Sequence, residues 1–220
     1  KEYDLVMDEE ITIIDSNTRN EKIKNFFINN RKNLIVGFST IIFLIIGYFL
    51  MIEIKERGKI KLANQFNITI INFKTEDKQS TINQLTKLIK ENDATYSPLA
   101  LYFLIDNDLI NNRDEINSLF DELINHTTLD EEIKNLNIYK KALFNSDFAT
   151  ENDLLQILNP IINSKSIWKS HSLYLVAEYF YSNGEKQKAK EFFNQILTLS
   201  NANSDIKMES KKRLDRDIGE

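Results

Sequence analysis

Hydrophobic residues follow two different patterns along this chain of 220 residues. Between Leu34 and Ile52 the sequence reads LIVGFSTIIFLIIGYFLMI, which is nineteen residues without a charge. A helix rises about 1.5 Å per residue, so this run reaches roughly 30 Å, the thickness of the hydrocarbon core of a bilayer. We therefore predict a transmembrane helix over residues 34–52.

Two other interpretations of the same run fit less well. A helix that is apolar on every face is rare inside a small soluble domain, because such a domain seldom covers all its faces. A cleaved signal peptide normally begins close to the N-terminus and ends in a small-x-small site. Here 33 residues precede the run, and Met51-Ile52-Glu53 stands at its end. We expect the segment to remain as an anchor.

Residues 1–33 form a charged arm before the predicted span. The first fifteen residues carry six acidic and one basic side chain, whereas residues 16–33 carry five basic and one acidic. Ile23, Phe26 and Phe27 have helical spacing, which predicts a short amphipathic helix at the bilayer surface. A plain extension of the transmembrane helix is the alternative. The basic residues slightly favour a cytoplasmic N-terminus, because five Lys or Arg precede the span and four follow it within fifteen residues.

After the span, apolar residues recur three or four positions apart, as in helices with one buried face. Thr150 stands three residues before Asp153, and Ser97 stands just before Pro98, so both are expected helix caps. No stretch alternates with period two for long enough to predict a strand. The predicted helices cover residues 56–74, 78–91, 97–111, 113–126, 129–145, 151–163, 166–183, 185–200 and 204–217.

Residues 170–203 have the spacing of one tetratricopeptide repeat, a helical hairpin of 34 residues. Small or apolar side chains occupy the positions where the two helices of such a hairpin meet, and a glycine occupies the turn. The closing proline of the repeat is replaced by Asn201. The matching positions are Leu173, Val176, Ala177, Phe180, Gly184, Ala189, Phe193 and Ile196.

Weaker periodicity extends this repeat towards the N-terminus. Leu155 lies 34 residues before Ala189, and Ile82 lies 34 residues before Ile116. The interval from Ile116 to Leu155 is 39 residues, so one repeat is irregular. One hairpin cannot bury its own apolar face and needs stacked neighbours. The sequence therefore predicts an all-α fold, in which a single transmembrane helix precedes a TPR-like α-solenoid of antiparallel helical hairpins over residues 53–220.

Composition and missing motifs exclude several classes of function. The chain has no cysteine and two histidines, so thiol catalysis, cysteine–zinc sites and histidine-rich metal sites are not expected. A net charge of −5 argues against general nucleic-acid binding. Residues 106–108 lack the glycine and distal glutamate of an EF-hand, and Asp121, Glu122 and His126 offer only one histidine for a metal. We predict no cofactor, no metal, no small-molecule substrate and no enzymatic activity.

An aromatic series near the end of the chain suggests a binding surface. In helical solenoids the first helix of each hairpin lines the concave groove. Tyr174 and Tyr181, seven residues apart, lie on one face of the predicted helix 166–183. The alternative is that these side chains close the end of the solenoid against the last helix, at Ile206 and Leu214. The predicted protein-binding residues are Trp168, Tyr174, Glu178 and Tyr181.

The layout of the chain resembles a known family. A charged arm enters the bilayer as EKIKNFFINNRKNLIVG, and degenerate repeats with an early YSPLALYFLI and a late ESKKRLDRDIG segment come after it. This order is similar to that of the YfgM-like family of tetratricopeptide proteins, the ancillary subunit of the bacterial SecYEG translocon. The resemblance covers nearly the whole chain, including the small positions Ala63, Ala100, Ala177 and Ala189.

The resemblance implies a location and a class of partner. It implies a single-pass protein of the bacterial inner membrane with a cytoplasmic N-terminus and a periplasmic repeat domain. The expected function is a scaffold that links a SecYEG-like translocon to periplasmic chaperones or exported polypeptides. An envelope scaffold that coordinates another machine, such as cell-wall assembly, is the alternative. An enzyme or sensor with an unrecognised helical domain is a further one.

Overall fold

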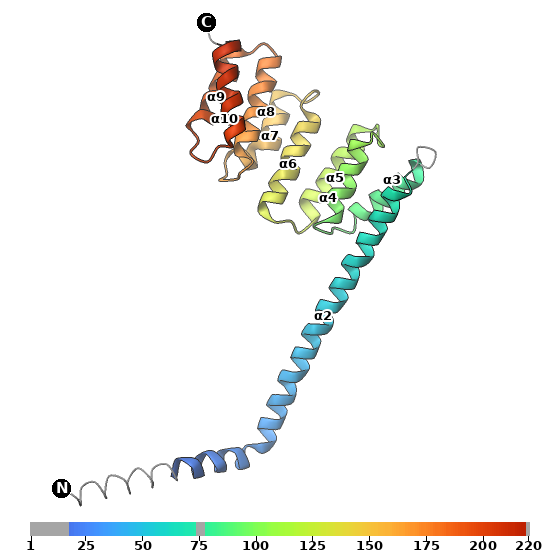
Figure 1. Ribbon diagram of the computed structural model, residues 1–220, viewed down its shortest axis with the longest axis vertical. Coiled ribbons are helices and arrows are strands. Elements are labelled where there is room, and N and C mark those ends of the chain that lie inside the picture. Colours follow the sequence, from blue (N-terminus) through green and yellow to red (C-terminus); the bar gives the residue numbers. More distant parts are fainter. Residues whose placement is uncertain (1–17, 74–77, 219–220) are drawn as a thin grey trace, which may run out of the picture. The chain divides into compact units, whose positions relative to one another are not determined.

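The computed structural model describes residues 18–73 and 78–218, and all regular structure in these two ranges is helical (Figure 1). The predicted all-α class is confirmed there. The acidic first half of the arm lies outside the described residues, as do Thr75, Glu76 and Asp77, where the sequence predicts a turn. After a helical stretch over residues 18–29, the elements are α2 Arg31–Ile71, α3 Lys78–Ile89, α4 Tyr96–Asp106, α5 Arg113–His126, α6 Glu131–Asn145, α7 Glu151–Ile162, α8 Lys169–Ser182, α9 Lys186–Thr198, α10 Ser204–Arg213 and a π-helical turn Leu214–Ile218.

The chain divides into two units, Lys1–Ile60 and Lys61–Glu220. In the first unit, residues 34–51 of α2 are all exposed, and α2 is long and apolar enough to cross a membrane. The predicted span 34–52 and the predicted helix 56–74 belong to one continuous helix, α2, which runs from Arg31 to Ile71. An i,i+4 bond from Arg57 Nε to Glu53 Oε1, at 2.7 Å, supports the helix at this point.

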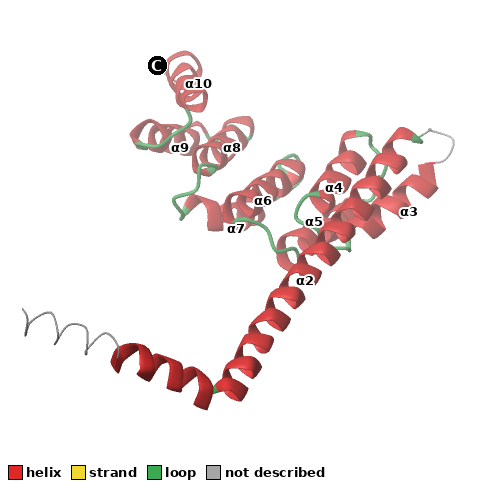
Figure 2. Cartoon of the chain, turned by 60° about the horizontal axis from the view of Figure 1, so that its bottom comes forward, coloured by secondary structure: helices red, strands yellow, loops and turns green. Residues whose placement is uncertain are grey.

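In the second unit the helices pack in chain order. Each helix from α3 onward contacts the next, and α3 also meets α5, α6 meets α8, and α8 meets α10 (Figure 2). Two apolar cores result. The first joins Phe66 of α2 with side chains of α3, α4 and α5. The second joins α6, α7, α8 and α9, and Ala142 of α6 belongs to it. Phe144 of α6 packs against the first core, so α6 links the two.

Polar side chains at the helix starts explain several boundaries. Thr150 and Asp153 form the predicted capping box at the start of α7, with the Thr150 side chain accepting from the Asp153 N–H. The cap predicted at Ser97 is wrong. Helix α4 begins at Tyr96, and Asp93 Oδ1 accepts from the backbone N–H of Thr95 and Tyr96 at 2.9 and 2.8 Å.

The helix predicted over residues 97–111 is too long. Helix α4 ends at Asp106, and Asp108 adopts a left-handed conformation with φ of 50°. This turn places the apolar side chains of Leu109 and Ile110 in the first core rather than on a continuing helix. The Lys78 ammonium donates to the Asp108 carbonyl at 2.9 Å, which ties the turn to the start of α3.

Candidate functional site

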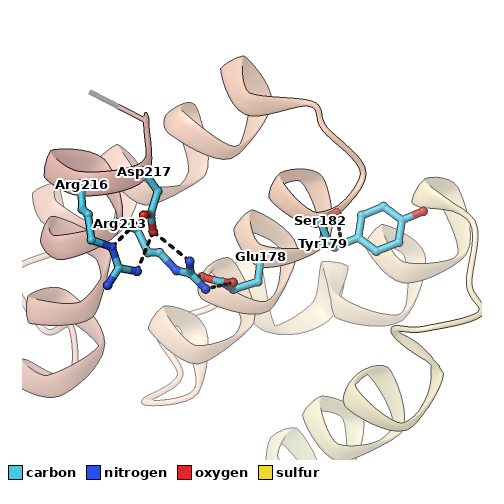
Figure 3. A network of polar contacts seen from close by, with 6 residues as sticks. All are labelled: Glu178, Tyr179, Ser182, Arg213, Arg216 and Asp217. Carbon is cyan, nitrogen blue, oxygen red and sulfur yellow. Dashed lines mark hydrogen bonds and ion pairs between the residues drawn. The ribbon is translucent and has the colours of Figure 1, made fainter. Parts of the chain in front are cut away.

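Glu178, one of the four predicted binding residues, is held by a residue that the sequence pattern did not identify. Its two carboxylate oxygens accept from Arg213 Nε at 2.8 Å and Arg213 Nη2 at 2.7 Å, so α8 and α10 are joined by a bidentate pair (Figure 3). Arg213 Nη1 also donates to Asp217 Oδ2 at 2.9 Å, and Arg216 contacts the same carboxylate. These arginines hold the pKa of the Asp217 carboxyl well below its usual range.

Tyr174 and Tyr181 lie beside the same arginine, Arg213. The Tyr174 ring meets Phe193 edge to face, with 5.5 Å between ring centroids, and the Arg213 guanidinium lies 5.1 Å from the Tyr181 ring centroid. Both tyrosines are partly buried against the second core, and burial raises the pKa of Tyr174. These contacts are the ones expected if the side chains close the domain against its last helix, and they leave peptide binding by these residues as a prediction.

Trp168 belongs to a different cluster. Its ring stacks on Tyr139 of α6 with centroids 5.8 Å apart, and it lies 5.1 Å from the ring of His171. A cavity of about 340 Å³ adjoins Trp168 and His171, with Asn201 and Asn203 on its wall. Burial lowers the pKa of His171, which favours the neutral imidazole. The four predicted residues are therefore divided between two groups of contacts, one at Arg213 and one at Tyr139.

An open apolar groove lies at another place, between α4 and α6. It has a volume of about 400 Å³, and two of its side chains remain well exposed: Leu99 by 41% and Ile133 by 40%. Only one of its lining residues carries a charge, so the groove offers apolar surface to water. The lining residues are Ala94, Thr95, Pro98, Leu99, Tyr102, Leu129, Asp130, Ile133 and Leu136.

Hydrogen bonds fix the inner wall of this groove. Tyr102 Oη donates to Asn137 Oδ1 at 2.7 Å, and Asn137 Nδ2 donates to the Ile133 carbonyl at 2.8 Å. The Lys140 ammonium lies 3.9 Å from the centroid of the Tyr102 ring. Burial raises the pKa of Tyr102 to about 12, so its hydroxyl stays protonated and continues to donate. These contacts hold the α4 and α6 walls of the groove in place relative to each other.

The sequence contains a signal for this groove that the repeat pattern did not use. The α4 segment YSPLALYFLID has apolar residues around nearly its whole circumference, more than one buried face requires. Ala100, Leu101 and Leu104 enter the first core, which leaves Leu99 facing outward. Excess apolar surface of this kind is typical of a binding surface. Arg213, by contrast, lies in a charged KKR sequence in which nothing distinguishes it from its neighbours.

Within residues 18–73 and 78–218 no group of three His, Asp or Glu side chains is placed to hold a metal ion. The contacts at Arg213, the cluster around Trp168 and the groove between α4 and α6 are thus made mainly of apolar, aromatic and ion-paired side chains. Comparisons with family models, curated proteins and solved structures found no significant match to the chain. The described residues define an all-helical protein with one helix long and apolar enough to cross a membrane.

Proposed function

We propose that the chain is a membrane-anchored scaffold whose helical domain binds other proteins in the groove between α4 and α6. The observation that carries this proposal is the exposed apolar groove itself, next to cores that already bury the other faces of the same helices. An apolar surface that stays open on a folded domain is typical of a protein-binding site.

The spacing of the helices supports a TPR-like solenoid. Helices α4, α6, α8 and α10 begin at Tyr96, Glu131, Lys169 and Ser204, which are 35, 38 and 35 residues apart. The tetratricopeptide repeat has 34 residues, so the hairpins α4–α5 and α8–α9 are close to this length. The longer interval belongs to the hairpin α6–α7, whose first helix links the two cores. In a solenoid of this kind, α4 and α6 are first helices of neighbouring hairpins, and first helices line the concave surface.

The proposed partner class comes from the resemblance to the YfgM-like family. The partner is a SecYEG-like translocon, a periplasmic chaperone or an exported polypeptide, with α2 in the bacterial inner membrane and the helical domain in the periplasm. An envelope scaffold for another membrane or cell-wall machine is the second candidate, because the same groove and anchor serve it equally well.

Site-specific photo-crosslinking from the full chain in its native membrane tests the proposal. A crosslinker at Leu99 or Ile133 is expected to capture a defined polypeptide, whereas one at Met208 of α10, which is 53% exposed, is the matched control. Recovery of translocon channel subunits from the groove positions supports the first candidate. Their consistent absence, with other envelope proteins captured instead, supports the second.

A double substitution gives the quantitative measurement. Leu99→Glu with Ile133→Glu should reduce capture by about tenfold or more, because apolar contacts at the centre of an interface carry about 2 kcal/mol. The melting temperature should hardly change, since both side chains are already exposed. Met208→Glu is the matched control and should leave capture intact. Undiminished capture by the double variant would show that the groove is not the binding site.

A further inference from the structure

The arm helix (residues 18–29) ends four residues before the apolar run that begins at Leu34. Asn30 is a turn, and both its backbone N–H and its side-chain Nδ2 donate to the Phe26 carbonyl at 3.0 Å. Helix α2 begins at the next residue, Arg31, and the ribbon changes direction there (Figure 2). The arm helix is therefore a separate element and not a plain extension of α2.

Three of the four large apolar residues of the arm helix lie on one side of it. At 3.6 residues per turn, Ile23, Phe26 and Phe27 fall within about 100° of one another and form one apolar stripe. Lys22 and Lys24 lie one on each side of this stripe. All three apolar side chains are exposed within the structure. Lysines that flank an apolar face extend their charged ends past it while their stems stay with the apolar surface.

The position of this stripe in the chain indicates its occupant. Only residues 31–33 separate the turn at Asn30 from Leu34, where the uncharged run begins. Three residues of helix rise about 5 Å, so when α2 crosses a bilayer the arm helix lies at headgroup depth. An apolar stripe at that depth meets the boundary between headgroups and acyl chains, and the flanking lysines meet the phosphates.

Charge selects the kind of lipid. Residues 18–33 contain Arg19, Lys22, Lys24, Arg31 and Lys32 against one acidic side chain, Glu21. We infer that the arm helix lies flat on the membrane that α2 crosses, with Ile23, Phe26 and Phe27 in the bilayer and its basic side chains on anionic lipid headgroups. The domain beyond α2 is thus held by a span and by a lipid-selective surface helix.

The lack of cysteine in the chain makes a direct test available. Single-cysteine variants of the full chain, labelled with the environment-sensitive fluorophore NBD, are reconstituted into vesicles that contain phosphatidylglycerol. Phe27→Cys probes the stripe, and Ile28→Cys, on the opposite side, is its matched control. Phe27 and Ile28 are 58% and 60% exposed in the structure, so protein contacts alone predict equal labels. Phe43→Cys in α2, 81% exposed, is the reference for lipid contact.

The expected result is a blue-shifted, iodide-protected label at Phe27→Cys, close to that at Phe43→Cys, and a water-exposed label at Ile28→Cys. Equal iodide quenching at positions 27 and 28 would overturn the inference, as would a water-exposed label at position 43. A third outcome would also overturn the inference: the label at position 27 is protected at all lipid compositions, but the protection disappears when the protein is diluted. That result would mean that the stripe binds a second copy of the chain.

A charge-reversed arm tests the lipid selectivity. In the Phe27→Cys background, Lys22→Glu with Lys24→Glu should remove the preference for phosphatidylglycerol over phosphatidylcholine vesicles. Each lysine near an anionic surface contributes about fivefold, so the docked fraction should respond strongly. Lys59→Glu with Lys61→Glu, on the other side of the span, is the matched control and should keep the preference. A preference that survives reversal of Lys22 and Lys24 contradicts the headgroup contact.

Discussion

Helix α4 and residues 34–52 of α2 are both apolar around nearly their whole circumference, yet α4 is largely buried and the α2 segment is exposed. Helix α4 buries Ser97, Pro98, Ala100, Leu101 and Leu104 against α3 and α5. The segment of α2 is exposed almost throughout, on eighteen consecutive residues from position 34 to 51. An apolar helix is stable only where its surface is shielded from water. The length of the apolar segment and the presence of packing partners determine whether that shielding comes from other helices or requires a bilayer.

The largest difference in stability between variants of the two helices is expected when an aspartate replaces an apolar residue in each. Leu104→Asp places an unpaired charge at a fully buried position of α4 and should cost about 4 kcal/mol or more, enough to unfold the helical domain. Ile45→Asp, near the middle of the α2 segment, should leave the thermal melting of the domain unchanged. It should instead oppose membrane insertion by about 3 kcal/mol.

Circular dichroism of the full chain in detergent measures the first effect, and carbonate extraction of membranes measures the second. The comparison between the helices would fail if Ile45→Asp lowered the melting temperature as much as Leu104→Asp. It would also fail if Leu104→Asp released the chain from membranes while the domain stayed folded.

Enlarging a small residue in each helix should give an effect of intermediate size on the stability of the domain. Ala100 is fully buried where α4 meets its neighbours, so Ala100→Leu should overpack the first core and destabilise the domain by about 1 to 3 kcal/mol. A Cβ at Gly47 of α2 meets nothing within 4 Å, so Gly47→Leu should leave the melting curve in place. A stabilised domain in Ala100→Leu would show that the site has unfilled space. Differential scanning calorimetry of both variants provides the measurement.

Much of the helical layout was predictable because the period of apolar residues follows from burial of one face. The start of α7 was predicted at its capping box, since Thr150 and Asp153 interact within one turn. The end of α4 was not. Its apolar pattern continues through Leu109 and Ile110, and only the left-handed Asp108 redirects them into the core. A backbone reversal of this kind depends on tertiary packing, which local spacing does not encode.

The candidate sites were less predictable than the helices. The residues Tyr174, Glu178 and Tyr181 were chosen because they share one face of α8, and the structure indeed places Tyr181 and Glu178 beside one side chain. That side chain, Arg213, lies 35 residues further along, and long-range pairs carry no local signal. The groove between α4 and α6 likewise needs the packing of two distant segments to be known.

The smallest expected effect on melting temperature comes from removing one tyrosine hydroxyl, that of Tyr102 in α4 or of Tyr48 in α2. Tyr102→Phe in α4 removes the donor to Asn137 Oδ1, which lies 2.7 Å away on a fully buried asparagine. An acceptor left unpaired in the interior costs about 1 kcal/mol, so the melting temperature should fall by a few degrees. Tyr48→Phe in the exposed part of α2 is the matched control and should change nothing in the domain.

The pH dependence of Tyr102→Phe separates the loss of the hydrogen bond from a loss of packing. Burial raises the folded-state pKa of Tyr102 to about 12, so the folded state holds the phenol proton more tightly than the unfolded state does. Its contribution is complete below pH of about 10 and declines as pH rises towards 12. Urea titrations over this range should show a shallower alkaline loss of stability in Tyr102→Phe than in the parent chain. Some slope should remain, because burial also raises the pKa values of Tyr139 and Tyr174. An unchanged slope would mean that the Tyr102 hydroxyl reaches water and that the inner wall of the groove is not closed there.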